Sequence, residues 1–220
     1  MKPGTNITAR KLTGNIGADI TGIDLKQPIG SDLAEQLQTL LATHQVMFFR
    51  DQHLNLKQQK TLTAAFGPAM RLPYVSPMDD EPDVIKVYKA ADEKGGVFGG
   101  DWHSDFSFLE APPSGSVLNA HTLPAYSGDT IWASQAAPWD ALPKTLQDLL
   151  LGRNVIHVGK PYGVKWAPPA KQQSGSGITM NCGETLQQIR SKPIRLCCKT
   201  RQPVAACCSS IPLMSPDFKD

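Results

Sequence analysis

The sequence lacks cysteine throughout its first 181 residues, and it also lacks any long uninterrupted apolar run. A secreted disulfide framework would spread its cysteines through the fold, so that class is not expected. No stretch approaches the length of a membrane span, and the N-terminal stretch has no apolar core of the kind that a secretory signal needs. A soluble cytoplasmic protein without a membrane partner is the expectation.

An excess of charge of one sign is also lacking, because 22 Lys and Arg stand against 20 Asp and Glu, for a net charge of +2. So small an excess gives no reason to expect a nucleic-acid partner. What the chain does have is 40% hydrophobic residues, 18 Gly and 18 Pro in 220 positions. This composition can form a core with many turns, and it predicts one domain that is richer in strands than in helices.

Hydrophobic periodicity predicts helices and short strands along the first 160 residues. A helix is expected over 31–44, with Ser31 as its N-cap and a stripe of leucines on one face. Further helices are expected over 56–67, ended by Gly67, and over 143–152. Alternating or β-branched stretches predict one or two short strands within 15–29 and strands at 45–52, 83–90, 101–108, 116–123 and 130–134. The stretch 153–160 is expected to be one more strand or an extended connector.

The last part of the chain differs in composition from the rest. Neither the helical nor the strand period can be followed there, and basic residues exceed acidic ones. Its cysteines do not have the C-x-x-C spacing of a zinc site. We therefore divide the chain into a folded domain at 1–180 and an atypical tail at 181–220, expected to be disordered or out of frame. The tail contains all five cysteines: Cys182, Cys197, Cys198, Cys207 and Cys208.

The stretch "DWHSDFSF" places a histidine and an aspartate two residues apart. In a strand, residues i and i+2 point to the same face, so His103 and Asp105 are expected to project side by side. An imidazole nitrogen and a carboxylate oxygen presented together can bind one divalent metal, and a third ligand would complete a facial triad. The alternative is a hydrogen-bonded His–Asp pair, because H-x-D alone is a weak motif.

The surrounding residues resemble the TauD/TfdA family of Fe(II)- and 2-oxoglutarate-dependent dioxygenases. The segment "WHSDFSFLEAPPSGSVLNAHTLPAYSGDTIWAS" carries W-H-x-D, then a P-P turn, then G-D-T-x-W, in the family's order. The stretches "IGADITGIDL" and "HQVMFFRDQ", and the "FG" after the second expected helix, also resemble the family. The resemblance runs from about residue 10 to about residue 180.

The resemblance implies a fold, two cosubstrates and a metal site. The fold is mainly β with flanking helices, a double-stranded β-helix or jelly-roll barrel that would be incomplete at the C-terminus. His103 and Asp105 match the first two Fe(II) ligands, and Thr130 matches the threonine that helps to hold the far carboxylate of 2-oxoglutarate. The implied reaction hydroxylates a small organic acid with O2 and releases succinate and CO2.

The remaining aromatic and histidine side chains near these positions match no ligand of the family. Trp102 and Trp132 are expected to pack, because large aromatic side chains usually fill cores. The other four histidines are interpreted as structural: His44, His53, His121 and His157.

The substrate is indicated only by class. Sulfonate-using members of the family carry a histidine and then a tyrosine shortly after the F-G motif. In "FGPAMRLPYVSP", Tyr74 matches the tyrosine, but Leu72 stands where the histidine is expected. This departure argues against taurine itself, and it leaves a related sulfonate, a carboxylate or an aryloxy acid open. The oligomeric state is not indicated, and a homo-oligomer remains open.

The family also needs a distal histidine as third ligand and an arginine for 2-oxoglutarate, and the tail contains no histidine. If the codons from Lys199 onward are read in a frame that begins at the third base of each codon, codon degeneracy permits the translation D-P-A-T-G-R-S-L-L-F-V-N-P-A-Y-V. This translation resembles the family's sequence at this point. We therefore expect a change of frame near 181–184. An inactive truncated pseudoenzyme or binding fragment is the alternative to an enzyme.

Overall fold

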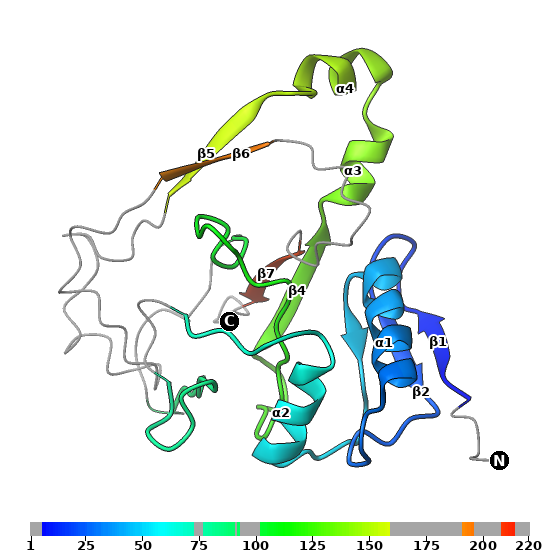
Figure 1. Ribbon diagram of the computed structural model, residues 1–220, viewed down its shortest axis with the longest axis vertical. Helices are drawn as coiled ribbons and strands as arrows, with labels where there is room; N and C mark the ends of the chain where they lie inside the picture. The colour runs from blue at the N-terminus through cyan, green and yellow to red at the C-terminus, as the bar shows by residue number, and fades with distance from the viewer. Residues whose placement is uncertain are drawn as a thin grey trace, which may run out of the picture.

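The computed structural model describes residues 6–72, 77–90, 92, 102–158, 191–195 and 208–213, the last two segments by their backbone alone. Eleven elements lie in these residues, and they form one three-stranded sheet, two two-stranded sheets and four helices. Figure 1 shows helix α1 alongside the N-terminal sheet, with the long strand β4 and its partner β7 beyond it.

The N-terminal sheet joins β1 (Thr8–Lys11), β2 (Ala18–Thr21) and β3 (Met47–Phe48). The strand β2 pairs antiparallel with β1 and parallel with β3. Only two residues of the strand expected over 45–52 are in the sheet. Gln45 and Asp51, which have φ values of 64° and 57°, leave the extended conformation on either side.

A buried carboxylate links the three strands of this sheet. Asp19 on β2 is 6% exposed. Its Oδ2 accepts a hydrogen bond of 2.7 Å from Arg10 on β1, and its Oδ1 accepts one of 3.1 Å from Arg50, just after β3. Burial alone raises the pKa of the Asp19 carboxyl, but the hydrogen bonds and charges of Arg50 and Arg10 together lower it below its usual value.

Helix α1 (Ser31–His44) has the predicted bounds. Its leucine stripe also faces the protein, since Leu37 is fully buried. The predicted N-cap is wrong, because Gly30 occupies the cap position and Ser31 is the first helical residue. The Ser31 hydroxyl donates to Asp32 Oδ1 at 3.0 Å instead of capping a backbone amide.

Helix α2 (Leu56–Ala64) begins at the predicted residue but ends three residues before Gly67. Its start is fixed by a capping box that the sequence interpretation missed: Asn55 Oδ1 accepts from the Gln58 amide, and Gln58 Oε1 accepts from the Asn55 amide, each at 2.9 Å. The two helices share an apolar core of Leu25, Leu37, Leu54 and Leu62.

The second half contains α3 (Ala136–Ala141) and α4 (Lys144–Leu150), between β4 (Asp129–Ser134) and β5 (Asn154–Val158). The predicted strand at 130–134 and the predicted helix at 143–152 are confirmed within one or two residues. Helix α3 was not predicted, since Pro138 interrupts its short pattern.

Two strands lie in the segment that showed no period. The strand β7 (Cys208–Leu213) pairs antiparallel with β4, and β6 (Ser191–Arg195) pairs antiparallel with β5. The described residues thus form three small sheets with flanking helices, but slightly more of them lie in helices than in strands, so the mainly-β composition is not borne out there. The jelly-roll barrel, incomplete at the C-terminus, and the division at residue 180 stay predictions.

Three predicted strands are absent from the described part of the chain. The segments 84–90, 102–108 and 116–123 are irregular or form turns there. Their β-branched and aromatic residues gave the expectation, but β propensity depends on a neighbouring strand with which to pair. Within the described residues, no helix is both long enough and apolar enough to cross a bilayer.

Candidate metal centre

His103 and Asp105 lie together, although not in a strand. The distance between His103 Nε2 and Asp105 Oδ1 is 3.1 Å. Both side chains are reachable from solvent, with exposed fractions of 34% for His103 and 55% for Asp105. The juxtaposition expected from the sequence is therefore present, but the physical reason is different, because residues 102–104 are irregular and a turn follows them, so no pleat aligns the two side chains.

The turn begins directly after the aspartate. Phe106 has a φ of 48°, in the left-handed region that a bulky residue adopts only when its surroundings hold it there. The Leu109 amide donates to the Phe106 carbonyl at 3.0 Å and closes the turn. Phe106 and Phe108 are 9% and 7% exposed, and their ring centroids lie 5.9 Å apart. The two phenylalanines anchor the segment while Asp105 stays at the surface.

The donor set fits a divalent metal in part. Two ligands at adjacent corners of an octahedron, each roughly 2.1 Å from the metal, lie about 3 Å apart, close to the separation of the His–Asp pair. The same distance also suits a direct hydrogen bond, so both interpretations of the pair remain open. Among the described residues, no group of three or more His, Cys, Asp or Glu side chains is placed to hold a metal ion.

Thr130 lies on β4 with a half-buried side chain, opposite Pro212 of β7 in the strand register. The structure connects β4 to the His–Asp segment at the far end of the strand from Thr130, where Gln135 Nε2 donates to Ser104 Oγ at 3.2 Å. Tyr74, the expected substrate residue, lies outside the described residues.

The two tryptophans have different surroundings. Trp132 on β4 makes an edge-to-face contact with Phe48 of β3, with ring centroids 5.5 Å apart and planes at 78°. This contact confirms the packing role expected for Trp132. Trp102 is 53% exposed, so the packing role expected for it is wrong.

The histidines interpreted as structural make local or bridging contacts. His121 is exposed, with Nε2 at 3.4 Å from Asn119 Nδ2. His157 on β5 shares a hydrogen bond of 2.7 Å between its Nδ1 and Ser107 Oγ. The sequence did not predict the contacts of Ser104 and Ser107, the two serines beside Asp105, because their partners Gln135 and His157 lie far away along the chain.

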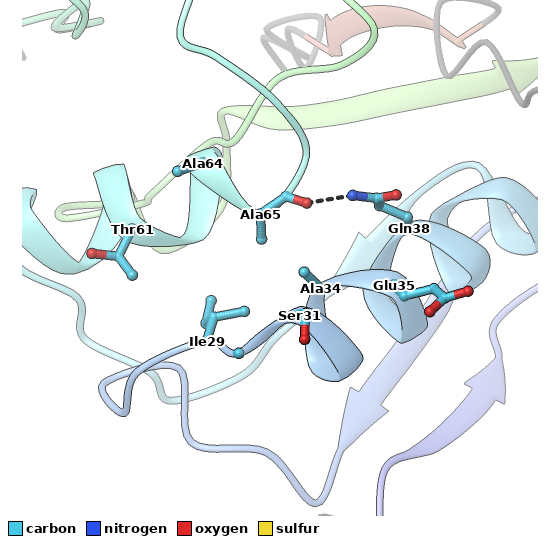
Figure 2. Close-up of a pocket in the computed structure, with 9 residues that line it drawn as sticks. Ile29, Ser31, Ala34, Glu35, Gln38, Thr61, Ala64 and Ala65 are labelled. Carbon is cyan, nitrogen blue, oxygen red and sulfur yellow. Dashed lines mark hydrogen bonds between the residues drawn. The ribbon is translucent and has the colours of Figure 1, made fainter.

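Two open depressions occur on the surface beside α1, and neither is lined by His103, Asp105 or Thr130. The first lies between the start of α1 and the end of α2, where Gln38 Nε2 donates to the Ala65 carbonyl at 2.6 Å (Figure 2). Its lining is mostly small residues and helix backbone. We assign it no function.

Comparison with known proteins agrees with the segment-level resemblance. Residues 8–194 match the family model described as "Taurine catabolism dioxygenase TauD, TfdA family". An alkylsulfatase of Acinetobacter baylyi is 33% identical over 156 residues, which are 70% of this chain and 48% of the relative. An alpha-ketoglutarate-dependent sulfate ester dioxygenase of Pseudomonas putida is 34% identical over 139 residues, 63% of this chain and 45% of that one.

A solved structure gives the same result in three dimensions. A taurine dioxygenase from Burkholderia xenovorans superposes with a TM-score of 0.57 at 28% identity, over 69% of this chain and 54% of that one. The chain spans about half the length of the proteins that it matches.

Proposed function

Because the chain belongs to the TauD, TfdA family, we propose that it acts as an Fe(II)- and 2-oxoglutarate-dependent dioxygenase that hydroxylates a small organic acid. The products would be the hydroxylated acid, succinate and CO2. The observation that carries this proposal is the separation of 3.1 Å between His103 Nε2 and Asp105 Oδ1, on the W-H-x-D segment.

His103 and Asp105 would hold the metal through an imidazole nitrogen and a carboxylate oxygen, a donor pair typical of non-haem Fe(II) sites. When bound, the metal centre supplies the oxygen chemistry that protein side chains cannot perform. The two residues would supply two ligands from one segment, and both are reachable from solvent. With two ligands from the described residues, we expect the metal to bind weakly.

Thr130 would bind the cosubstrate. Its hydroxyl can donate a hydrogen bond to the far carboxylate of 2-oxoglutarate and so orient that molecule. Trp132, two residues along β4, packs on Phe48 and limits the movement of this strand. The contribution of β4 is therefore orientation of 2-oxoglutarate, while the oxidation depends on the metal.

We propose a small anionic substrate, a sulfate ester or sulfonate first, and a carboxylate or aryloxy acid second. Two relatives are named an alkylsulfatase and a sulfate ester dioxygenase, which supports the first class. Leu72 in place of the expected histidine argues against taurine. Tyr74 remains the proposed substrate-binding residue, and O2 completes the set of reactants.

A second candidate is an inactive pseudoenzyme or binding fragment. It is favoured by one observation: the described residues bring two metal ligands together and offer no third. Such a protein would bind metal or 2-oxoglutarate weakly and would not convert 2-oxoglutarate to succinate.

One assay separates the two candidates. The chain is incubated with Fe(II), 2-oxoglutarate, ascorbate, O2 and a panel of alkyl sulfates, sulfonates and aryloxy acids, and succinate is measured. An enzyme releases succinate above the enzyme-free level, and His103→Ala abolishes the release, whereas the matched control His121→Ala does not. Binding of Mn(II) without release of succinate in the presence of any compound of the panel would favour the pseudoenzyme.

A further inference from the structure

The segment that carries His103 and Asp105 is not held by strand pairing in the described part of the chain. Its backbone runs irregularly through residues 102–110 and includes the left-handed Phe106. A strand would be fixed by a ladder of backbone hydrogen bonds. Here side chains must supply much of the restraint, and two of them are serines on either side of Asp105.

The first serine contact joins the segment to the end of β4. Ser104, between the two proposed ligands, accepts a hydrogen bond of 3.2 Å from Gln135 Nε2. Gln135 directly follows β4 and is the N-cap residue of α3. This bond links residues that are far apart in sequence, so it is a tertiary contact and not a local turn.

The second serine contact joins the segment to β5. Ser107 Oγ and His157 Nδ1 lie 2.7 Å apart, and both side chains are partly buried. A bond of this length with partial burial is more persistent than an exposed one, because less water competes for it. The two contacts attach the segment to two different elements, one on each side of Asp105.

We propose that Ser104 and Ser107, with Gln135 and His157, are positioning residues for the metal pair. The inference rests on the proposed function in one respect, that His103 and Asp105 bind a metal. A serine hydroxyl is on a short side chain, so a bond to it fixes the adjacent backbone closely. With both ends of the Asp105 turn attached, the carboxylate stays within reach of His103.

The inference predicts that loss of either hydroxyl lets the turn move and separates the two ligands part of the time. Groups that orient metal ligands from behind contribute substantially to affinity, so Ser107→Ala should raise the Kd for Mn(II) by about 3- to 10-fold. Ser107→Thr keeps the hydroxyl and should restore the affinity. Ser114→Ala removes an exposed serine from the turn that follows and is the matched control.

Two measurements on the full chain test the proposal. Mn(II) affinity is measured for the wild type and each variant, and hydrogen–deuterium exchange is followed in peptides covering 102–110 and α1. We expect weaker binding and faster exchange at 102–110 in Ser107→Ala, with unchanged exchange in α1. Gln135→Ala, which changes an exposed side chain, tests the other contact should Ser107→Ala unfold.

The outcomes separate this inference from the proposed function. If the wild type binds Mn(II) and Ser107→Ala and Gln135→Ala bind it equally well, the positioning role is overturned while the metal site stands. If the wild type binds no Mn(II), the proposed metal site fails, and hydrogen–deuterium exchange at 102–110 alone tests whether the two contacts hold the segment. Equal exchange there in Ser107→Ala, Gln135→Ala and the control Ser114→Ala overturns the inference.

Discussion

His103 Nε2 lies 3.1 Å from Asp105 Oδ1, and the two residues come directly before a turn at Phe106 instead of lying in a strand. A pair outside a strand depends on the contacts that hold its own segment. We therefore expect the proposed metal site to be sensitive to residues outside the H-x-D motif.

Removal of either proposed ligand should weaken metal binding. We expect His103→Ala and Asp105→Asn each to raise the Kd for Mn(II) by about 10-fold or more, because each removes one of the two proposed metal ligands. His121→Ala, an exposed histidine, should leave the affinity unchanged. Calorimetric titration or competition with a metal-sensitive dye measures the effect. Equal affinities in His103→Ala and the wild type would favour the hydrogen-bonded pair.

Thr130→Val should raise the concentration of 2-oxoglutarate needed for half-maximal succinate release. The substitution keeps the shape of the side chain and removes one hydrogen bond to a charged group, which contributes about 1.5–3 kcal/mol. The KM for 2-oxoglutarate should therefore rise roughly 10-fold or more, with Mn(II) affinity unchanged. Thr122→Val, at an exposed position before β4, is the control. An unchanged KM for 2-oxoglutarate would show that the Thr130 hydroxyl does not bind this cosubstrate.

Asp19 should make folding stability depend on pH. Its carboxyl pKa is lowered in the folded chain from the ordinary 3.8, with the hydrogen bonds of Arg50 and Arg10 outweighing burial. The folded state then binds fewer protons than the unfolded state, so this stabilisation is fully present above about pH 4 and is lost as pH falls through the lower folded pKa. Asp19→Asn should melt at a lower temperature at pH 7.

Thermal melts between pH 2 and 7 measure this dependence. The difference in melting temperature between the wild type and Asp19→Asn should shrink as the solution is acidified. Asp79→Asn changes an exposed carboxylate and should follow the wild type. A difference that stays constant at every pH would show that packing of Asp19, not its charge, stabilises the sheet.

Gly22→Ala should destabilise the N-terminal sheet. Gly22 has a φ of 78°, and a Cβ built there would lie 2.1 Å from the Asn6 carbonyl oxygen, so the backbone must shift. Such overpacking together with the left-handed conformation costs about 2 kcal/mol or more of unfolding free energy. Gly14→Ala is the control, because a Cβ there meets nothing within 4 Å. Urea unfolding compares the two, and equal stability would contradict the close approach of Gly22 to the Asn6 carbonyl.

Leu37→Ala should cost about 2–5 kcal/mol of unfolding free energy, because it deletes a fully buried side chain from the shared core of α1 and α2. Leu149→Ala, at a position that is 58% exposed, should change stability little. Urea unfolding measures both. The structure would be contradicted if the two substitutions had the same effect.

The reading frame of the tail stays a prediction, and the nucleotide sequence after codon 180 tests it. A shifted frame that continues the family's text would support a frameshift. The backbone pairing of β6 with β5 and of β7 with β4 shows that two tail segments form strands as they stand.

The sequence by itself determined several local elements and the family. The helix at Ser31–His44 follows from a 3.6-residue apolar period, and β4 from a β-branched run after a Gly-Asp turn. The H-x-D pair and Thr130 were located by motif, since residue type and spacing are properties of the chain alone. Local pattern was sufficient for these elements, although it missed the local capping box of Asn55 and Gln58 and the short helix α3.

Only the tertiary structure decided what lies around the proposed metal ligands His103 and Asp105. A turn at Phe106 is present in place of the predicted strand. Ser104 accepts a hydrogen bond from Gln135, and Ser107 shares one with His157, although both partners are far away in sequence. The same holds for Asp19, whose two arginines come from β1 and from the residues just after β3. Such contacts depend on which segments meet in space, and no periodicity within a single segment contains that information.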